Sequence, residues 1–273
     1  MKFQKIAAVA GVLALAGSLA ACGGNDDDTG SDAGGDKIKI GIKYDQPGLG
    51  FKEADGSFAG FDVDMATYIA KGLGYDKNQI EFVEAVSANR ETFLKDGTVD
   101  MILATYSITD ERKAEVDFAG PYYVAGQDIL VAADNKDITG PDSLDGKKLC
   151  SVTGSTPAEN VKENYAKGVQ LQEFDTYSKC ITAIEGGQLD AMTTDDIILA
   201  GYAQQDPGKF KIVGKAFSEE NYGVGLPKGS EDRDKINDLI EKSFEDGTWE
   251  KAFNDNLGES GYKLPEPPKV DRY

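Results

Sequence analysis

The sequence predicts an α/β protein of two lobes, on the basis of three observations. Apolar runs typical of buried strands alternate with helical patterns, which favours parallel or mixed sheets built from βαβ units. This pattern occurs once in residues 37–125 and begins again in residues 126–221. A further strand then returns to the first unit, so lobe 1 comprises residues 37–125 and 222–264. The chain is therefore expected to cross between the lobes twice, near Gly126 and Asn221, with a ligand cleft between them.

The N-terminus predicts a lipoprotein signal peptide over residues 1–21. Lys2 and Lys5 precede an apolar stretch that is too short to span a membrane, and the run Leu-Ala-Ala-Cys ends at Cys22. An ordinary secretory peptide, the alternative, would need no cysteine there. Cys22 is therefore the expected lipidation site, and residues 22–36 form a flexible acidic linker. The expected location is the outer face of the cell membrane.

Composition excludes several classes of function. The formal charge of the 273 residues is −19, and it becomes −21 without Lys2 and Lys5. Such a charge argues against nucleic acid and anionic lipid surfaces as partners. The chain has no histidine, which excludes serine–histidine and cysteine–histidine catalysis and histidine-based metal sites. We expect no metal and no cofactor.

Strands and helices can be assigned in order along lobe 1. The expected strands are 37–43, 80–85, 99–104 and 222–226. The expected helices are 61–71, 89–96, 232–244 and 248–254. Trp249 is most simply a packing residue, and residues 265–273, which are rich in proline, form an extended tail.

Lobe 2 contains a sharp helix-start signal. Thr156 as N-cap, Pro157 at the first helical position and Glu159 three residues after the cap make a capping box. A helix start after a glycine-containing loop presents free amide hydrogens to an anion, although plain capping explains the same residues. The other expected elements are strands at 127–133, 148–152, 169–174, 190–194 and 210–213, and helices at 179–185 and 196–204.

The strand at 101–104 ends abruptly in hydroxyl groups and an arginine. Thr105 and Ser107 follow the strand directly, and Arg112 lies a few residues beyond. The planar fork of an arginine suits a carboxylate, and hydroxyl groups can complete its hydrogen bonds. Alternatively, Arg112 is a solvated residue on a short helical turn begun by Thr109.

Three segments resemble family 3 of the extracellular solute-binding proteins, the polar amino-acid receptors of ABC importers. They are GxxDMILATYSITDERxxxVDFAGPYY from Gly97, GFDVDMATYIAKGLG from Gly60, and DGTWEKAFNDNLG from Asp246. The resemblance extends from about Ile38 to about Tyr262. It implies a type II periplasmic-binding-protein-like fold and a monomeric, non-enzymatic receptor that delivers its ligand to an ABC permease.

The resemblance also implies ligand-binding roles. The α-carboxylate would be bound by Arg112 together with the polar residues Thr105, Ser107, Ser155 and Thr156. The α-ammonium would be bound by Asp195, which could instead serve only the dipole of the following helix. In receptors for acidic amino acids, basic residues at the positions of Lys43 and Arg90, the latter following Ser87, bind the distal carboxylate. The alternative is that these two cations form surface salt bridges.

The expected ligand is L-glutamate, with aspartate and glutamine as alternatives. The segments KYDQPGLG and PYYVAGQD, together with Cys150 and Cys180, look like those of the glutamate-binding lipoproteins of Gram-positive bacteria. In an exported protein two cysteines indicate a disulfide, the alternative being two buried thiols. A lipid-anchored amino-acid sensor and a dehydratase-like enzyme on the same fold are the other functions considered.

Overall fold

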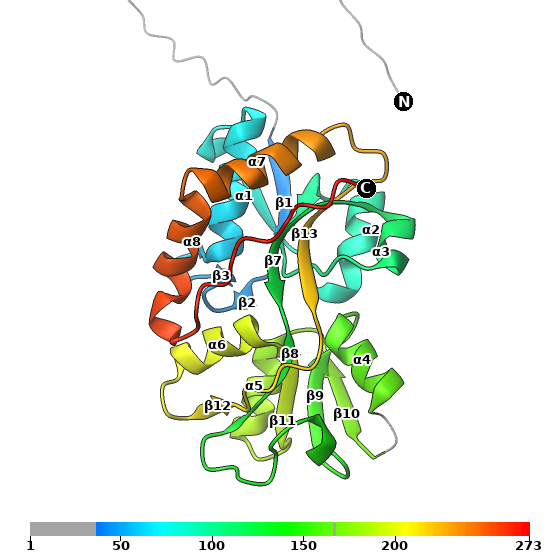
Figure 1. Ribbon diagram of the computed structural model, residues 1–273, viewed down its shortest axis with the longest axis vertical. Coiled ribbons are helices and arrows are strands. Elements are labelled where there is room, and N and C mark those ends of the chain that lie inside the picture. Colours follow the sequence, from blue (N-terminus) through cyan, green and yellow to red (C-terminus); the bar gives the residue numbers. More distant parts are fainter. Residues whose placement is uncertain (1–36, 166–167) are drawn as a thin grey trace, which may run out of the picture. The chain divides into compact units, whose positions relative to one another are not determined.

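The computed structural model describes residues 37–165 and 168–273 (Figure 1). The predicted signal peptide, Cys22 and the predicted linker 22–36 lie outside the described residues. Within the described ranges, no helix is long and apolar enough to cross a membrane.

The first sheet has five strands in the order β5-β1-β6-β13-β7. Strands β5, β1 and β6 are parallel, and β13 is antiparallel to β6 and β7. The bounds are β1 Ile38–Ile42, β5 Ile80–Glu84, β6 Met101–Ile102, β7 Asp117–Ala125 and β13 Glu220–Leu226. Of the parallel or mixed sheet expected from the sequence, the mixed form is the one present.

Helices cover both faces of the first sheet. Successive side chains of a strand point to opposite faces, so a strand that is apolar throughout packs against helices on both sides. In β6, Met101 joins the core with α1, whereas Ile102 joins a second core with Leu94 of α2. The helices on the α1 side are α1 Phe61–Leu73, α7 Arg233–Glu245 and α8 Thr248–Leu257. Those on the other side are α2 Arg90–Lys95 and α3 Asp110–Glu115.

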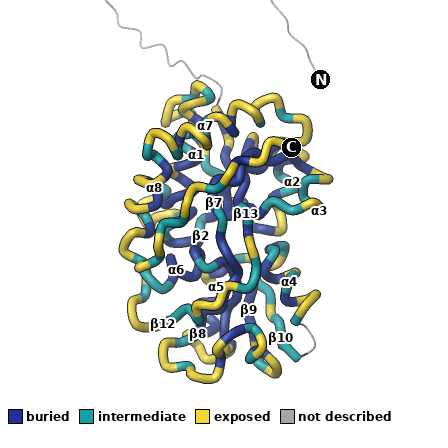
Figure 2. Tube along the Cα trace, viewed as in Figure 1, coloured by how far each residue is buried: buried dark blue, intermediate teal, exposed yellow. Residues whose placement is uncertain are grey.

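The second sheet repeats this plan in the order β10-β9-β11-β8-β12. Strands β10, β9 and β11 are parallel, and β8 is antiparallel to both of its neighbours, β11 and β12. The strands are β8 Gln127–Ala132, β9 Lys148–Val152, β10 Gln170–Phe174, β11 Ala191–Asp195 and β12 Phe210–Ile212. The helices are α4 Thr156–Asn164, α5 Tyr177–Glu185 and α6 Asp196–Gln205. Figure 2 shows that most of the central strands of both sheets are buried.

Two crossings join the lobes, and they are hydrogen-bonded to each other. The first is Gly126, between β7 and β8, and the second lies between β12 and β13. Phe217 N donates to Gln127 O at 2.9 Å, and Gln127 N donates to Ser218 Oγ at 3.1 Å. A Cβ on Gly126 would lie 2.8 Å from the Ala216 Cβ, so this close approach requires glycine.

A small three-stranded sheet in lobe 1 was not predicted. Its strands are β2 Asp45–Gln46, β3 Gly50–Lys52 and β4 Phe58–Ala59. Strands of two or three residues are too short to show a period-two pattern. The short 3-10 helices are η1 Lys77–Gln79, η2 Ser87–Asn89, η3 Pro141–Ser143 and η4 Gly258–Ser260.

The predicted cap of α4 was wrong by one residue. Ser155 is the N-cap, and its side chain accepts a hydrogen bond from Ala158 N at 3.2 Å. Thr156 is already helical, and its hydroxyl donates to Glu220 Oε2 at 2.7 Å instead. Because Ser155 and Thr156 both carry a hydroxyl group, the sequence leaves the N-cap ambiguous. Glu220 is 64 residues from Thr156 in the sequence, so their contact is not visible in the local pattern.

The C-terminal tail has no regular secondary structure, but it is not free of the fold. Val270 is buried, Asp271 N donates to Gly120 O at 2.8 Å, and Phe118 N donates to Tyr273 Oη at 2.9 Å. The tail therefore covers β7. The predicted disulfide is present, and it joins Cys150 in β9 to Cys180 in α5.

Candidate functional site

Arg112 lies on α3, which begins after Thr109 as the alternative interpretation expected, but its side chain is only 11% exposed. The guanidinium donates to Ser107 O at 2.8 Å and, across the lobes, to Gly154 O at 3.0 Å. Its Nε lies 3.1 Å from Glu91 Oε1. Arg112 is therefore held in a fixed position where the two lobes meet.

The start of α4 meets lobe 1 beside Arg112. Ser107 Oγ and Thr156 Oγ1 lie 3.2 Å apart, and they come from different lobes. Gly154, in the loop before α4, has a φ of 76°, and a Cβ there would lie 2.8 Å from the Ala88 Cα. Only glycine therefore allows the loop to approach lobe 1 so closely.

Lys43 follows β1 and is 3% exposed. Its Nζ lies 2.7 Å from Ser87 Oγ. Burial, and after it the nearby positive charge of Arg90, lower the pKa of Lys43 to about 7. An ammonium in this position is costly unless an anion joins it.

Arg90, at the start of α2, is the second buried cation and is 2% exposed. It donates to Ala104 O at 2.9 Å and Thr105 O at 3.2 Å, and it lies over the ring of Tyr106 at 4.2 Å. Its Nε has no partner. Among the described residues, no carboxylate oxygen lies within 4.0 Å of Arg90 or of Lys43. The surface salt bridges considered from sequence are therefore absent for both side chains in this part of the chain.

Asp195 ends β11 in lobe 2 and is 3% exposed. Tyr222 Oη donates to Asp195 Oδ2 at 2.5 Å, while Oδ1 has no partner. Burial raises the pKa of Asp195 well above its usual range, and Glu220 adds to this effect. The carboxylate makes no side-chain cap of α6, so service to the helix alone does not account for its burial.

We call these residues the polar cluster: Lys43, Ser87, Arg90, Thr105, Ser107, Arg112, Ser155, Thr156 and Asp195. The charges in it influence one another, since Arg90 shifts the pKa values of both Lys43 and Asp195. Lobe 1 supplies the positive charges and lobe 2 supplies Asp195. The arrangement can hold a small molecule that carries both signs of charge and an additional negative group.

Asp62 holds part of this cluster in place by hydrogen bonds, but it was not predicted from the sequence. It is fully buried in the first turn of α1, where it accepts Thr105 N at 3.0 Å and Tyr122 Oη at 2.7 Å. Burial raises its pKa to about 6. Thr105 has a φ of 46°, an unusual value for a non-glycine residue, and Asp62 and Gln46 hold it there. An aspartate in the first turn suits the helix dipole, so no sequence pattern distinguishes Asp62 from an ordinary helix-start residue.

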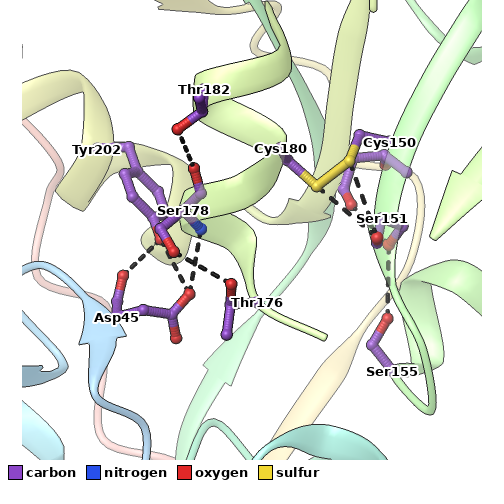
Figure 3. Close-up of a disulfide and its surroundings, with 10 residues drawn as sticks. Asp45, Cys150, Ser151, Ser155, Thr176, Ser178, Cys180, Thr182 and Tyr202 are labelled. Carbon is purple, nitrogen blue, oxygen red and sulfur yellow. Dashed lines mark hydrogen bonds between the residues drawn. A yellow bond between two sulfur atoms is a disulfide. The ribbon is translucent and has the colours of Figure 1, made fainter. Parts of the chain in front are cut away.

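The lobes also meet at a second place, which we call the hairpin contact: Asp45 and Pro47 of lobe 1 with Ser178, Gly201 and Tyr202 of lobe 2. Asp45 Oδ2 accepts Ser178 N at 3.1 Å, at the start of α5, and Tyr202 Oη donates to Asp45 O (Figure 3). A Cβ on Gly201 would lie 2.0 Å from Pro47 O. The disulfide ties α5 to β9 close to this contact (Figure 3).

A cavity of about 420 Å³ opens at the rim of the polar cluster. It is lined by Thr109, Arg112, Thr156 and Glu220 together with Glu111, Glu159, Asn160 and Glu163. Within residues 37–165 and 168–273, no group of three or more histidine, cysteine, aspartate and glutamate side chains could hold a metal ion.

Comparison with known proteins gives consistent similarities. Residues 38–259 match the model of the bacterial extracellular solute-binding proteins, family 3. The glutamate-binding protein GluB of Corynebacterium glutamicum is 44% identical over 97% of this chain and 94% of its own length. The glutamine-binding protein of Geobacillus stearothermophilus is 40% identical over 70% of this chain and 73% of its own. The solved structure of an ancestral arginine-binding protein bound to arginine is similar with a TM-score of 0.76 and 36% identity, covering 81% of this chain and 98% of that one.

Proposed function

Because the chain belongs to family 3 of the bacterial extracellular solute-binding proteins, with their type II two-lobed fold, we propose that it captures L-glutamate for an ABC importer. Glutamate is bound between the lobes and delivered to a membrane permease. Cys22 carries the lipid that anchors the protein to the outer face of the membrane. Aspartate and glutamine are weaker ligands.

The observation that supports glutamate as the ligand is a pair of buried cations, Lys43 and Arg90, that have no carboxylate beside them. Arg112 and Asp195 match the α-carboxylate and α-ammonium that every amino acid carries. Lys43 and Arg90 remain, and burying two cations without an anion is strongly unfavourable. A ligand with a second carboxylate supplies the missing charge. Glutamine would leave that charge unmatched, and a basic side chain would add to it.

The α-groups have partners on both lobes, which explains why binding favours closure. Arg112 and Ser107 approach the α-carboxylate from lobe 1, and Ser155 and Thr156 approach it from the start of α4. Asp195 brings its free Oδ1 to the α-ammonium from lobe 2. A ligand held this way bridges the lobes and stabilises the closed state by its preference for it.

We propose a binding role rather than a catalytic one. Each charged group of the polar cluster has a partner in the bound amino acid, and this accounts for its burial without a reaction. The relatives described above are solute-binding proteins. A sensor would use the same site with a different membrane partner, and no feature of the described residues favours that partner over a permease.

Titration calorimetry of residues 37–273 against glutamate, aspartate, glutamine and arginine tests the proposal. We expect glutamate to bind most tightly and glutamine at least about tenfold more weakly, because an unmatched buried charge costs more than 1.4 kcal/mol. Tighter binding of glutamine or arginine would refute the glutamate assignment and leave the family intact.

A further inference from the structure

Lys43 and Arg90 are both buried cations, but their hydrogen-bond partners differ in kind. Lys43 Nζ lies 2.7 Å from a hydroxyl, Ser87 Oγ, whereas Arg90 donates to the carbonyl oxygens of Ala104 and Thr105. A hydroxyl can accept from an ammonium or donate to a neutral amine, whereas a carbonyl oxygen can only accept. The surroundings of Lys43 therefore suit both of its protonation states, whereas the carbonyl acceptors around Arg90 favour the charged one.

The charges around Lys43 leave its protonation finely balanced. Arg90 and Arg112 oppose the charged form, and Asp45, Glu84 and Asp62 favour it. None of these three carboxylates forms an ion pair with Lys43 within 4.0 Å. Burial is the largest of the influences that lower the pKa of Lys43 to about 7, whereas burial lowers that of Arg90 only to about 10. Of these two cations, only Lys43 can change charge near neutral pH, and Asp62, whose pKa is about 6, is largely ionised at pH 8.

We propose that Lys43 is a specificity-determining residue that keeps its proton in the complex with an acidic amino acid and loses it to solvent in the complex with a neutral one. Selection of glutamate over glutamine then weakens as the pH rises. This inference rests on the proposed function, since it requires the second carboxylate of the ligand to lie beside Lys43 and Arg90. The only covalent change is at the ammonium nitrogen, whose proton passes to the buffer.

The direction of the pH dependence follows from a comparison of the glutamate complex with the glutamine complex. A carboxylate beside Lys43 raises its pKa well above 7, whereas the amide of glutamine leaves it near 7. Between these two values the glutamate complex holds up to one more proton than the glutamine complex. By linkage, the ratio of the two affinities is constant below about pH 6 and falls by up to about tenfold per pH unit above about pH 7. Proton exchange at Asp195 is common to both ligands and cancels in the comparison.

Calorimetry in two buffers of different ionisation enthalpy, phosphate and Tris, counts the protons exchanged on binding. At pH 8 we expect the glutamate complex of the purified protein to hold close to one more proton than the glutamine complex. Over pH 6 to 8.5 the glutamate preference should fall by roughly an order of magnitude or more. Equal proton counts for the two ligands, with glutamate tightly bound, would overturn the inference and leave the proposed function standing. Failure to bind glutamate at pH 6 would refute the proposed function itself.

Two variants sharpen the test. Lys43→Arg keeps a charge that does not titrate in this range, so the difference in proton count should vanish and the preference should no longer depend on pH. Lys39→Arg, at an exposed position of the same strand, should behave as the wild type. A persistent difference in Lys43→Arg would assign the proton to another group and overturn the proposal. The wild-type proton count decides the question even if Lys43→Arg does not fold.

Discussion

The two places where the lobes meet differ in how their charges are paired. In the polar cluster Lys43 and Arg90 are buried without a carboxylate, and Asp195 has one oxygen without a partner. In the hairpin contact the charge of Asp45 is matched inside the protein, because Ser178 N at the start of α5 donates to its carboxylate. One contact is complete in the chain alone, and the other leaves charged groups that the proposed ligand would match.

This difference separates two contributions to closure. Since its partners are all present, the hairpin contact stabilises the closed state with or without ligand. The polar cluster opposes closure when empty, because like charges on Lys43, Arg90 and Arg112 are buried together. The ligand reverses the sign of this second contribution. Variants in the cluster should therefore change binding strongly, and variants in the hairpin contact should change the closing equilibrium.

The largest effect is expected for Arg112→Ala. It removes the proposed partner of the α-carboxylate and the bond to Gly154 O, and losing one partner of a buried ion pair costs about 3–5 kcal/mol. Calorimetry should show glutamate affinity reduced by roughly 150- to 5,000-fold, with the melting temperature little changed. Lys113→Ala, on the same helix, should retain binding. Micromolar binding by Arg112→Ala would remove this residue from the site.

The next effect concerns the disulfide that ties α5 to β9. Its cysteines are 30 residues apart, and a closed loop of this length contributes about 3–4 kcal/mol. Replacing Cys150 and Cys180 by serine should lower the urea midpoint, and adding dithiothreitol should lower it for the wild type but not for the variant. An unchanged midpoint in the variant would show that the bridge contributes little.

Gly201→Ala tests closure at the hairpin contact. The new methyl group would overlap Pro47 O only when the lobes are closed, and overpacking of this kind costs about 1–3 kcal/mol. Glutamate affinity should fall roughly 10- to 100-fold. The melting temperature without ligand should not fall, because alanine favours the helix α6.

Gly258→Ala is the matched control for Gly201→Ala, since the nearest atom to its Cβ is 3.9 Å away. Unchanged affinity in Gly201→Ala, measured beside this control, would mean that bound ligand does not require the contact seen here.

The smallest effect is expected for Asp45→Asn. Loss of a charge-assisted hydrogen bond to Ser178 N costs about 1 kcal/mol, so affinity should fall roughly fivefold. Fluorescence energy transfer between dyes on the two lobes should show a smaller closed fraction without ligand. Asp55→Asn, in the loop between β3 and β4 of the same small sheet and hydrogen-bonded to Ser57, should match the wild type. A closed fraction equal to that of the wild type would contradict a ligand-independent role for the hairpin contact.

The sequence predicted the elements whose periodicity is long and uninterrupted. β1, β9 and α1 fall within a residue or two of their expected bounds. β7 was missed because Gly120 and Pro121 interrupt its apolar pattern, although it is the strand that leads to the first crossing. β2 was too short to predict, and it carries the hairpin contact.

For the site, the sequence predicted the charged side chains but not the buried residues that hold the site in place by hydrogen bonds. Lys43, Arg90 and Asp195 are conspicuous because a charge must find a partner, and all three are buried. Asp62 and Glu220 are equally buried, but their partners Thr105 and Thr156 lie more than forty residues away. Local patterns do not report such distant pairs, so only the folded arrangement reveals them.

Trp249 is the one tryptophan of the sequence and is almost fully buried in lobe 1. Its indole nitrogen donates to Tyr122 O at 2.8 Å, Tyr122 in turn donates to Asp62, and Asp62 accepts the amide of Thr105. The protein thus contains its own optical probe, connected to the polar cluster by three hydrogen bonds. Tryptophan emission can follow a ligand titration without any attached dye, and its signal comes from lobe 1 alone.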